Sequence, residues 1–213
     1  MLESAYLTLV DLFTSLLPET VAVAAVFLLI ALLIAWVLES IDALIGHRLD
    51  RLGIRPRTYS GLLGILAAPL LHSGFGHLAA NTVPLFILGC LIAFSDPEVL
   101  LLVTIMGWIL SGFGAWLLGS SKSRHLGASG LVFAYFGFLL AFGVTRQSPL
   151  AIAIAAVAVV LYGGMIWGLV PFREGRSWQS HFFGFASGVA CAVFLVPLRD
   201  SMAADALQAA GQL

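Results

Sequence analysis

The sequence predicts an all-α polytopic membrane protein built from six transmembrane helices. Of its 213 residues, 61% are hydrophobic and only 10% are charged, whereas a soluble domain carries roughly a quarter charged residues. The apolar residues form uncharged runs of about 18 residues or more, the length that crosses a bilayer. Each run must be helical, because an open strand edge leaves backbone polar groups unsatisfied in lipid. The expected spans are 21–38, 78–95, 99–119, 127–145, 149–170 and 180–198.

The remaining segments are short. Residues 1–20 alternate apolar and polar positions with a helical period, so we expect an amphipathic segment on the membrane surface or an extension of the first helix. The first loop, residues 45–76, carries four arginines and then the apolar stretch GLLGILAAPLLH. That stretch is too short to span, so we expect a partly membrane-embedded segment packed against the bundle. With a short Ala-rich tail at 199–213, the chain is predicted to be one membrane domain over 21–198. No basic tract indicates a nucleic-acid partner.

Polar residues inside the expected spans are candidates for function, because in membranes they usually face the bundle or a water-filled cavity. His77 and Asn81 begin the second span and share one helical face, since they are four residues apart. Two donors stacked in this way could stabilise one developing negative charge. An interhelical hydrogen bond explains them equally well.

Ser129 begins the fourth span between Gly127 and Gly130, which let another chain approach its hydroxyl. Free backbone N–H groups at a helix start can stabilise an oxyanion, and this stabilisation is often the largest contribution to catalysis of acyl transfer. Taken alone, however, the GASG motif fits helix packing better than catalysis, because Gly130, Ala134 and Gly137 also permit close packing.

His181 begins the sixth span and shares a helical face with Gly184 and Gly188. Contact between this face and the glycine-rich face of the fourth span would bring His181 within hydrogen-bonding reach of Ser129. A neutral histidine can accept the serine proton and return it to the leaving amine. Neither span contains Asp or Glu, so the sequence predicts a Ser–His dyad. The even-numbered spans all start on the same side of the membrane, which places these residues together with His77.

Three motifs in order, HxxxN at His77–Asn81, GxSG at Gly127–Gly130 and HxxGxxxG at His181–Gly188, resemble those of bacterial rhomboid intramembrane serine proteases. The stretch PRTYSGLLGILAAPLLHSGFGHL also resembles the rhomboid first loop. The resemblance implies a six-helix rhomboid bundle with Ser129 as nucleophile and His181 as base. It further implies that His77, Asn81 and the Ser129 N–H line the oxyanion hole. The glycines of the last two motifs would pack the site.

The resemblance also implies the substrate class. Rhomboids cut transmembrane or membrane-proximal segments of other membrane proteins, without a metal or cofactor. Substrate would enter sideways, with the fifth span and the loop around Pro171–Trp178 as mobile parts. This chain departs from the family pattern in two places. Phe133 replaces a frequent tyrosine, keeping an aromatic platform for the imidazole, and the first loop lacks the Trp-Arg pair found in many members.

The basic residues are distributed unevenly over the two sides of the membrane. The loops on the predicted active-site side hold eight of the ten basic residues, and the opposite side holds Arg146 and Arg199. The positive-inside rule would place the eight in the cytoplasm. The resemblance places them outside it, in a bacterial inner membrane. We expect the latter orientation, because arginines beside an interfacial segment can bind lipid headgroups.

Three other functions compete with proteolysis. A non-catalytic rhomboid-like protein would bind or escort membrane proteins, but such relatives typically lack the Ser or the His. A transporter or channel would distribute polar residues through the depth of several helices, whereas here they cluster at one end. A purely structural role explains each motif separately but not their joint occurrence on one side.

Overall fold

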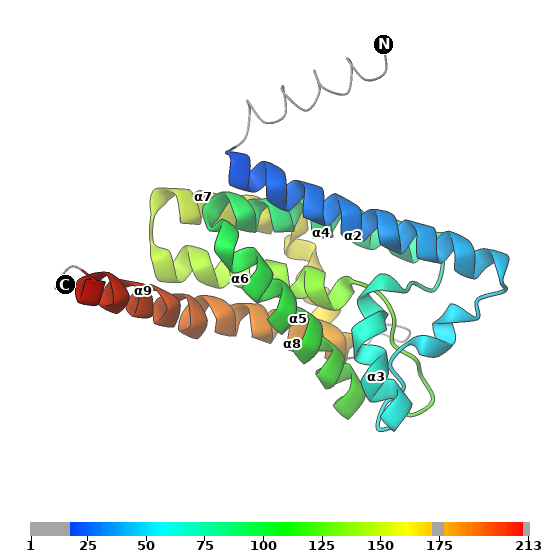
Figure 1. Cartoon of the computed structure of the whole chain (residues 1–213). Helices are drawn as coiled ribbons and strands as arrows, with labels where there is room; N and C mark the ends of the chain where they lie inside the picture. The colour runs from blue at the N-terminus through cyan, green and yellow to red at the C-terminus, as the bar shows by residue number, and fades with distance from the viewer. Residues whose placement is uncertain (1–17, 172–176, 211–213) are drawn as a thin grey trace, which may run out of the picture.

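The computed structural model of the chain describes residues 18–171 and 177–210. This part of the chain is a helical bundle without β-strands. Six of its helices are long and apolar enough to cross a membrane. The predicted all-α, six-span fold is therefore confirmed. The spans are α2 (Glu19–Leu44), α4 (Phe75–Ser95), α5 (Pro97–Leu118), α6 (Ser129–Arg146), α7 (Pro149–Tyr162) with η3 (Gly163–Leu169), and α8 (Trp178–Ala190) continuing through η4 (Cys191–Leu195) into α9 (Val196–Ala210). In Figure 1, α2 runs along one outer side of the bundle and α9 along the other.

Two helix ends differ from the sequence prediction. The first span extends to Leu44 rather than ending near residue 38, so Glu39 and Asp42 belong to its last turns. The last helix continues through the predicted tail to Ala210, because this segment is rich in alanine, the strongest helix former. Residues 1–17, which make up most of the predicted amphipathic segment, lie outside the described part of the chain, and so do residues 211–213.

The first loop contains the predicted short apolar helix, α3 (Tyr59–Ala67), followed by the 3₁₀ turn η2 (Ala68–Leu70). Two tryptophans of α5 hold it against the bundle. Trp108 Nε1 donates to the Ile65 carbonyl and Trp116 Nε1 to the Thr58 carbonyl, each at 2.8 Å. α3 lies beside α5 in Figure 1. These contacts anchor the first loop although it lacks the Trp-Arg pair.

α6 is the central helix of the bundle and contacts α4, α5, α7 and α8. Its aromatic side chains Tyr135, Phe136 and Phe138 are fully buried. The Tyr135 hydroxyl lies 2.7 Å from Thr104 Oγ1 of α5, so this buried polar atom has a hydrogen-bonding partner. The first residue of α6 is Ser129, which therefore starts from the most rigidly packed element of the fold.

Glycines bring α6 and α8 into backbone contact. A Cβ added at Gly184 would overlap the Gly130 carbonyl oxygen, and one added at Gly188 would overlap the Ala134 carbonyl oxygen. Any larger residue at either glycine would force the helices apart. This close packing is the contact between two small-residue faces that the sequence predicted, and it sets the separation of Ser129 from His181.

Candidate active site

The two helix starts place Ser129 and His181 in direct contact. The Ser129 hydroxyl oxygen lies 2.9 Å from His181 Nε2, the length of an ordinary hydrogen bond. His181 is buried, with 9% of its surface exposed, while Ser129 is half-buried and lines a cavity. The imidazole is thus shielded on most sides, while the Ser129 side chain borders the cavity.

The other ring nitrogen of His181 fixes the orientation of the imidazole. Nδ1 lies 3.0 Å from the carbonyl oxygen of Gly168 in η3. A carbonyl can only accept a hydrogen bond, so Nδ1 carries the proton and Nε2 is left to accept the Ser129 proton. The Phe133 ring stacks on the imidazole with centroids 4.2 Å apart and planes 12° apart. A backbone carbonyl and an aromatic face therefore do the orienting that a carboxylate does in a catalytic triad.

His77 and Asn81 converge on the backbone immediately before Ser129. A Cβ added at Gly127 would lie 2.6 Å from the His77 ring and 3.4 Å from Asn81 Nδ2. Gly127 has a φ of 107°, a conformation that side chains rarely adopt, so glycine is required here for two reasons. Asn81 Nδ2 also donates to the His77 carbonyl at 3.2 Å, and Ser73 Oγ lies 3.3 Å from His77 Nδ1. These contacts hold both side chains toward the same space.

The end of the first loop fixes the backbone that leads into Ser129. The Gly127 N–H donates to the Ala68 carbonyl at 2.9 Å, and the Ala128 N–H donates to His72 Nε2 at 3.3 Å. His72 is buried, and this burial lowers its pKa to about 4, so it is neutral at physiological pH. The first loop therefore takes part directly in positioning the start of α6.

A cavity of about 820 Å³ opens over these residues. It is lined on one side by Ala80 and Pro84 of α4 and on another by Tyr162 of α7 and Met165 of η3. None of the described residues that line it is acidic. Of the loop around Pro171–Trp178, residues 172–176 lie outside the described residues.

His125, the second histidine near Ser129 in sequence, has different partners. Its Nδ1 lies 2.6 Å from Ser177 Oγ and its Nε2 lies 3.0 Å from Ser123 Oγ. Its backbone pairs with Ile54 of the first loop. Burial lowers the pKa of His125, so the neutral form is favoured. His125 therefore links three segments around the cavity mouth, and it is His181 that contacts Ser129.

The structure brings together all the residues predicted for the site: Ser129, His181, His77, Asn81, Gly127, Gly130, Phe133, Gly184 and Gly188. Gly168 and His72 were missed. An added Cβ at Gly168 would lie 2.6 Å from the Phe133 ring and 3.3 Å from His181 Nδ1, so only glycine allows this approach. A Gly-Gly pair at 163–164 and the glycine at 168 interrupt the fifth span, and this interruption was the available signal.

This chain is similar to one described protein family and to several mycobacterial proteins. Residues 59–198 match the family model described as the Rhomboid domain. An uncharacterized protein of Mycobacterium tuberculosis is 42% identical over 168 residues, which cover 75% of this chain and 70% of the relative. An uncharacterized protein of Mycobacterium leprae is 38% identical over 207 residues, covering 90% of this chain and 82% of the relative.

Proposed function

The chain belongs to the rhomboid family, and we propose that it is an intramembrane serine endopeptidase with Ser129 as nucleophile and His181 as general base. One observation carries the proposal. His181 Nε2 lies 2.9 Å from the Ser129 hydroxyl oxygen while His181 Nδ1 lies 3.0 Å from a carbonyl oxygen. This pairing leaves the imidazole in the tautomer that a general base requires.

The reaction would proceed in two steps. As the Ser129 oxygen attacks the scissile carbonyl carbon, its proton passes to His181 Nε2. The resulting imidazolium keeps its Nδ1–H bonded to the Gly168 carbonyl, which stabilises the positive charge. Nε2–H then protonates the leaving amine, and the acyl-enzyme is released by a water that His181 deprotonates in the same way. The dyad supplies every proton transfer, so the proposal includes no cofactor.

The negative charge of the tetrahedral intermediate would be stabilised by three donors. His77 and Asn81 converge beside Gly127, and the Ser129 N–H belongs to the first turn of α6. The first N–H groups of a helix have no intrahelical acceptor and lie at the positive end of its dipole. Donors fixed in place before the reaction need no reorganisation as charge develops, which is why such sites accelerate acyl transfer.

The substrates we propose are transmembrane segments of other proteins, which would reach the cavity from the surrounding lipid between α4 and α7. The catalytic unit would be the membrane domain over residues 21–198. We place it in a bacterial inner membrane with the cavity open to the extracytoplasmic side. Two arginines on that side bond to backbone carbonyls, Arg57 to Leu117 and Gly119 and Arg124 to Arg51. Because these two arginines hydrogen-bond to the protein's own backbone, they need not set the membrane orientation in the way that cytoplasmic Lys and Arg residues do.

The test is covalent labelling of the purified full chain by a fluorophosphonate probe, which reports an activated serine without a known substrate. We expect Ser129 to be labelled in the wild type and in Ser95→Ala, a matched serine at the far end of α4. Labelling should disappear in Ser129→Ala and in His181→Ala. Cleavage of a transmembrane segment in liposomes should follow the same pattern. Folded wild-type protein that is neither labelled nor active in liposomes would instead indicate a non-catalytic rhomboid-like binding protein.

A further inference from the structure

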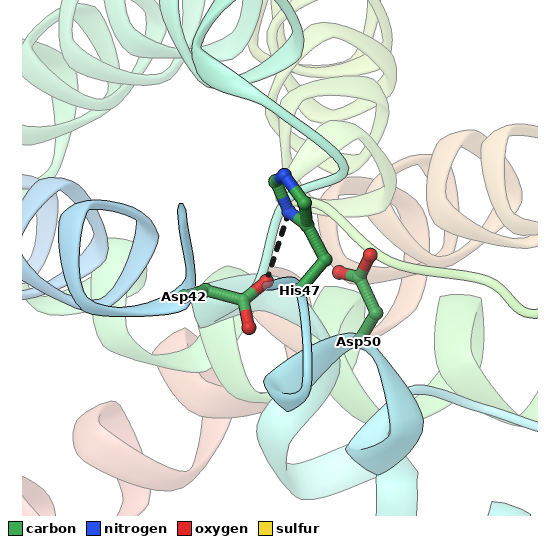
Figure 2. A group of neighbouring side chains, drawn as sticks. All are labelled: Asp42, His47 and Asp50. Carbon is green, nitrogen blue, oxygen red and sulfur yellow. Dashed lines mark ion pairs between the residues drawn. The ribbon is translucent and has the colours of Figure 1, made fainter. Parts of the chain in front are cut away.

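A second polar cluster lies where α2 meets the first loop. Figure 2 shows Asp42 from the last turns of α2, His47 from the turn that follows, and Asp50 from the 3₁₀ turn η1 (Leu49–Leu52). One potential ligand atom from each of these three side chains lies within 4.8 Å of the other two. This cluster, the α2–η1 corner, contains none of the residues that line the candidate active site.

The turn after α2 folds these side chains back onto the helix. Gly46 and His47 have positive φ values of 73° and 58°, which reverse the chain. As a result, His47 Nδ1 lies 3.4 Å from Asp42 Oδ2. The Leu49 N–H donates to Asp42 Oδ1 at 2.6 Å. Asp42 is buried, and each of its carboxylate oxygens has a contact, one with His47 and one with the Leu49 N–H. These contacts hold the carboxylate in one orientation.

A third acidic residue reinforces the corner. Glu39 lies three residues before Asp42 on the same face of α2, and only 2% of its surface is exposed. It interacts electrostatically with Asp42, Asp50 and His47. The Gly74 backbone N–H is nearby, yet neither Glu39 carboxylate oxygen has a hydrogen-bond partner of ordinary geometry. Buried carboxylates are normally paired with a cation or hydrogen-bond donor or bound to a metal. Glu39 therefore lacks such a partner among the described residues.

The other acidic side chains of the corner also lack a lysine or arginine ion-pair partner in the described part of the chain. Asp50 Oδ1 is also buried without a hydrogen-bond partner. Within the described residues, no lysine or arginine forms an ion pair with any of these three carboxylates, although the first loop holds four arginines. Asp50 interacts electrostatically with Asp42, with His47 and with Arg124. Three carboxylates therefore lie near one imidazole, and Arg124 acts on Asp50 only from beyond ion-pair distance.

We propose that Asp42, His47 and Asp50 bind a divalent transition-metal ion of the Zn²⁺ or Mn²⁺ type, with the buried Glu39 carboxylate contributing negative charge beside them. Ligand atoms bound to one ion with bonds of about 2.0–2.4 Å must lie within about 4–5 Å of one another, and the three ligand atoms of the corner meet this condition. Carboxylate oxygens together with one imidazole nitrogen form a ligand set typical of Zn²⁺ and Mn²⁺. Ca²⁺ and Mg²⁺ are typically bound by oxygen ligands alone. The half-exposed His47 leaves a path for the ion and for water ligands.

The ion would fasten the end of α2 to the first loop. η1 contains Arg51, whose carbonyl accepts a hydrogen bond from Arg124, and Ile54 just beyond it pairs with His125. The corner is thus connected to the segment that leads into Ser129, but it does not contribute a group to the reaction. This proposal stands independently of the proposed protease activity.

The test uses the full chain, purified in detergent through a tag without histidine and stripped with a chelator. Zn²⁺ and Mn²⁺ are titrated by calorimetry, and the thermal unfolding midpoint is measured with and without each ion. We expect one ion bound per chain and a higher midpoint when it is bound. His47→Asn and Asp50→Asn should each weaken binding by at least about 10-fold. Asp205→Asn, which changes an exposed acid on α9, should bind as the wild type does.

The variants are chosen so that folding failure does not confuse the result. Asparagine tolerates the left-handed backbone of His47, and the His47 side chain is half-exposed, so His47→Asn should remain folded. Glu39→Gln removes the buried charge and should raise the midpoint of the metal-free protein while reducing its response to the ion. Wild-type protein that binds neither ion at millimolar concentration would overturn the proposal. So would variants of His47 and Asp50 that bind as tightly as the wild type.

Discussion

Two polar clusters at the same end of the bundle differ in how their polar atoms are satisfied. In the Ser129–His181 pair, both ring nitrogens of His181 lie at hydrogen-bonding distance from oxygen atoms, and the carbonyl partner of Nδ1 leaves Nε2 to accept from Ser129. In and beside the α2–η1 corner, three carboxylates lie near one imidazole, and neither Glu39 oxygen has a hydrogen-bond partner of ordinary geometry. The first cluster is complete as the fold makes it. The second needs a proton or a cation from solution.

The difference shows what each cluster does. A neutral pair of hydrogen-bonded groups can be buried at small cost and can exchange a proton during a reaction. A buried group of like charges is costly alone, so its stability depends on what binds there. The dyad should therefore govern activity and the corner should govern stability, and substitutions can separate the two.

The largest expected effect comes from crossing the two regions. His181→Ala should lower peptidase activity by at least about 1,000-fold, because the serine loses its base. It should leave the metal-dependent rise in unfolding midpoint unchanged. Asp50→Asn should do the reverse, keeping fluorophosphonate labelling at saturating probe and losing the response to the ion. Labelling rate and unfolding midpoint measured on both variants check this. If Asp50→Asn abolished labelling in folded protein, the two regions would not be separable.

The donors around Gly127 come next. Asn81→Ala and His77→Ala should each reduce turnover by about 10- to 1,000-fold, because each removes one hydrogen bond to the developing oxyanion. Initial rates of cleavage in liposomes measure the effect. Thr82→Ala, one residue along α4 and hydrogen-bonded to Leu78 and Trp36, is the control and should change turnover little. Full activity in Asn81→Ala would remove the amide from the oxyanion hole.

His72 makes stability depend on pH. Its pKa in the folded protein is about 4, against an ordinary value of 6.5, because it is buried. The unfolded chain therefore binds more protons between these values. Stability should be full above pH 6.5 and fall as the pH drops, by about 3 kcal/mol at pH 4. Unfolding midpoints from pH 4 to 8 measure this, and His72→Gln, which keeps an acceptor for the Ala128 N–H, should flatten the profile. Identical profiles for both proteins would assign the dependence to other groups.

The smallest effect concerns the orientation of the imidazole. Gly168→Ala places a methyl group against the Phe133 ring and near His181 Nδ1, so the labelling rate should fall by about 10-fold as the ring shifts. Gly164→Ala is a matched control in the same helix, because an added Cβ there meets no atom within 4 Å. Equal labelling rates in the two variants would show that the Gly168 contact does not position the histidine.

The sequence predicted the six spans and the dyad because both depend on local patterns. Apolar runs of spanning length define the helices. The glycines at positions 130, 184 and 188 define the face on which α6 and α8 meet, and that contact brings Ser129 to His181. Gly168 could not be predicted as the partner of His181, because its role depends on how η3 departs from the α-helix and which way one carbonyl points.

The α2–η1 corner was missed for a related reason. The apolar run of the first span ends near residue 38, and the sequence pattern did not single out the acidic residues that follow it as a site. In the structure α2 continues to Leu44, and this extension buries Glu39 and Asp42. The left-handed turn at Gly46 and His47 then returns the chain to the helix. Whether a charged residue at the end of a membrane helix is buried or exposed depends on this tertiary geometry, and the hydropathy of the sequence does not reveal it.

The two tryptophans of α5 also constrain how the protein is assembled. Trp108 and Trp116 are eight residues apart, which is about 12 Å along a helix. They bond to carbonyls at the two ends of α3, which is synthesised earlier. When α3 leaves the ribosome, α5, which carries both tryptophans, has not yet been synthesised. The first loop cannot take its final position until the third span is inserted, so the start of α6, which rests on that loop, is completed late in biogenesis.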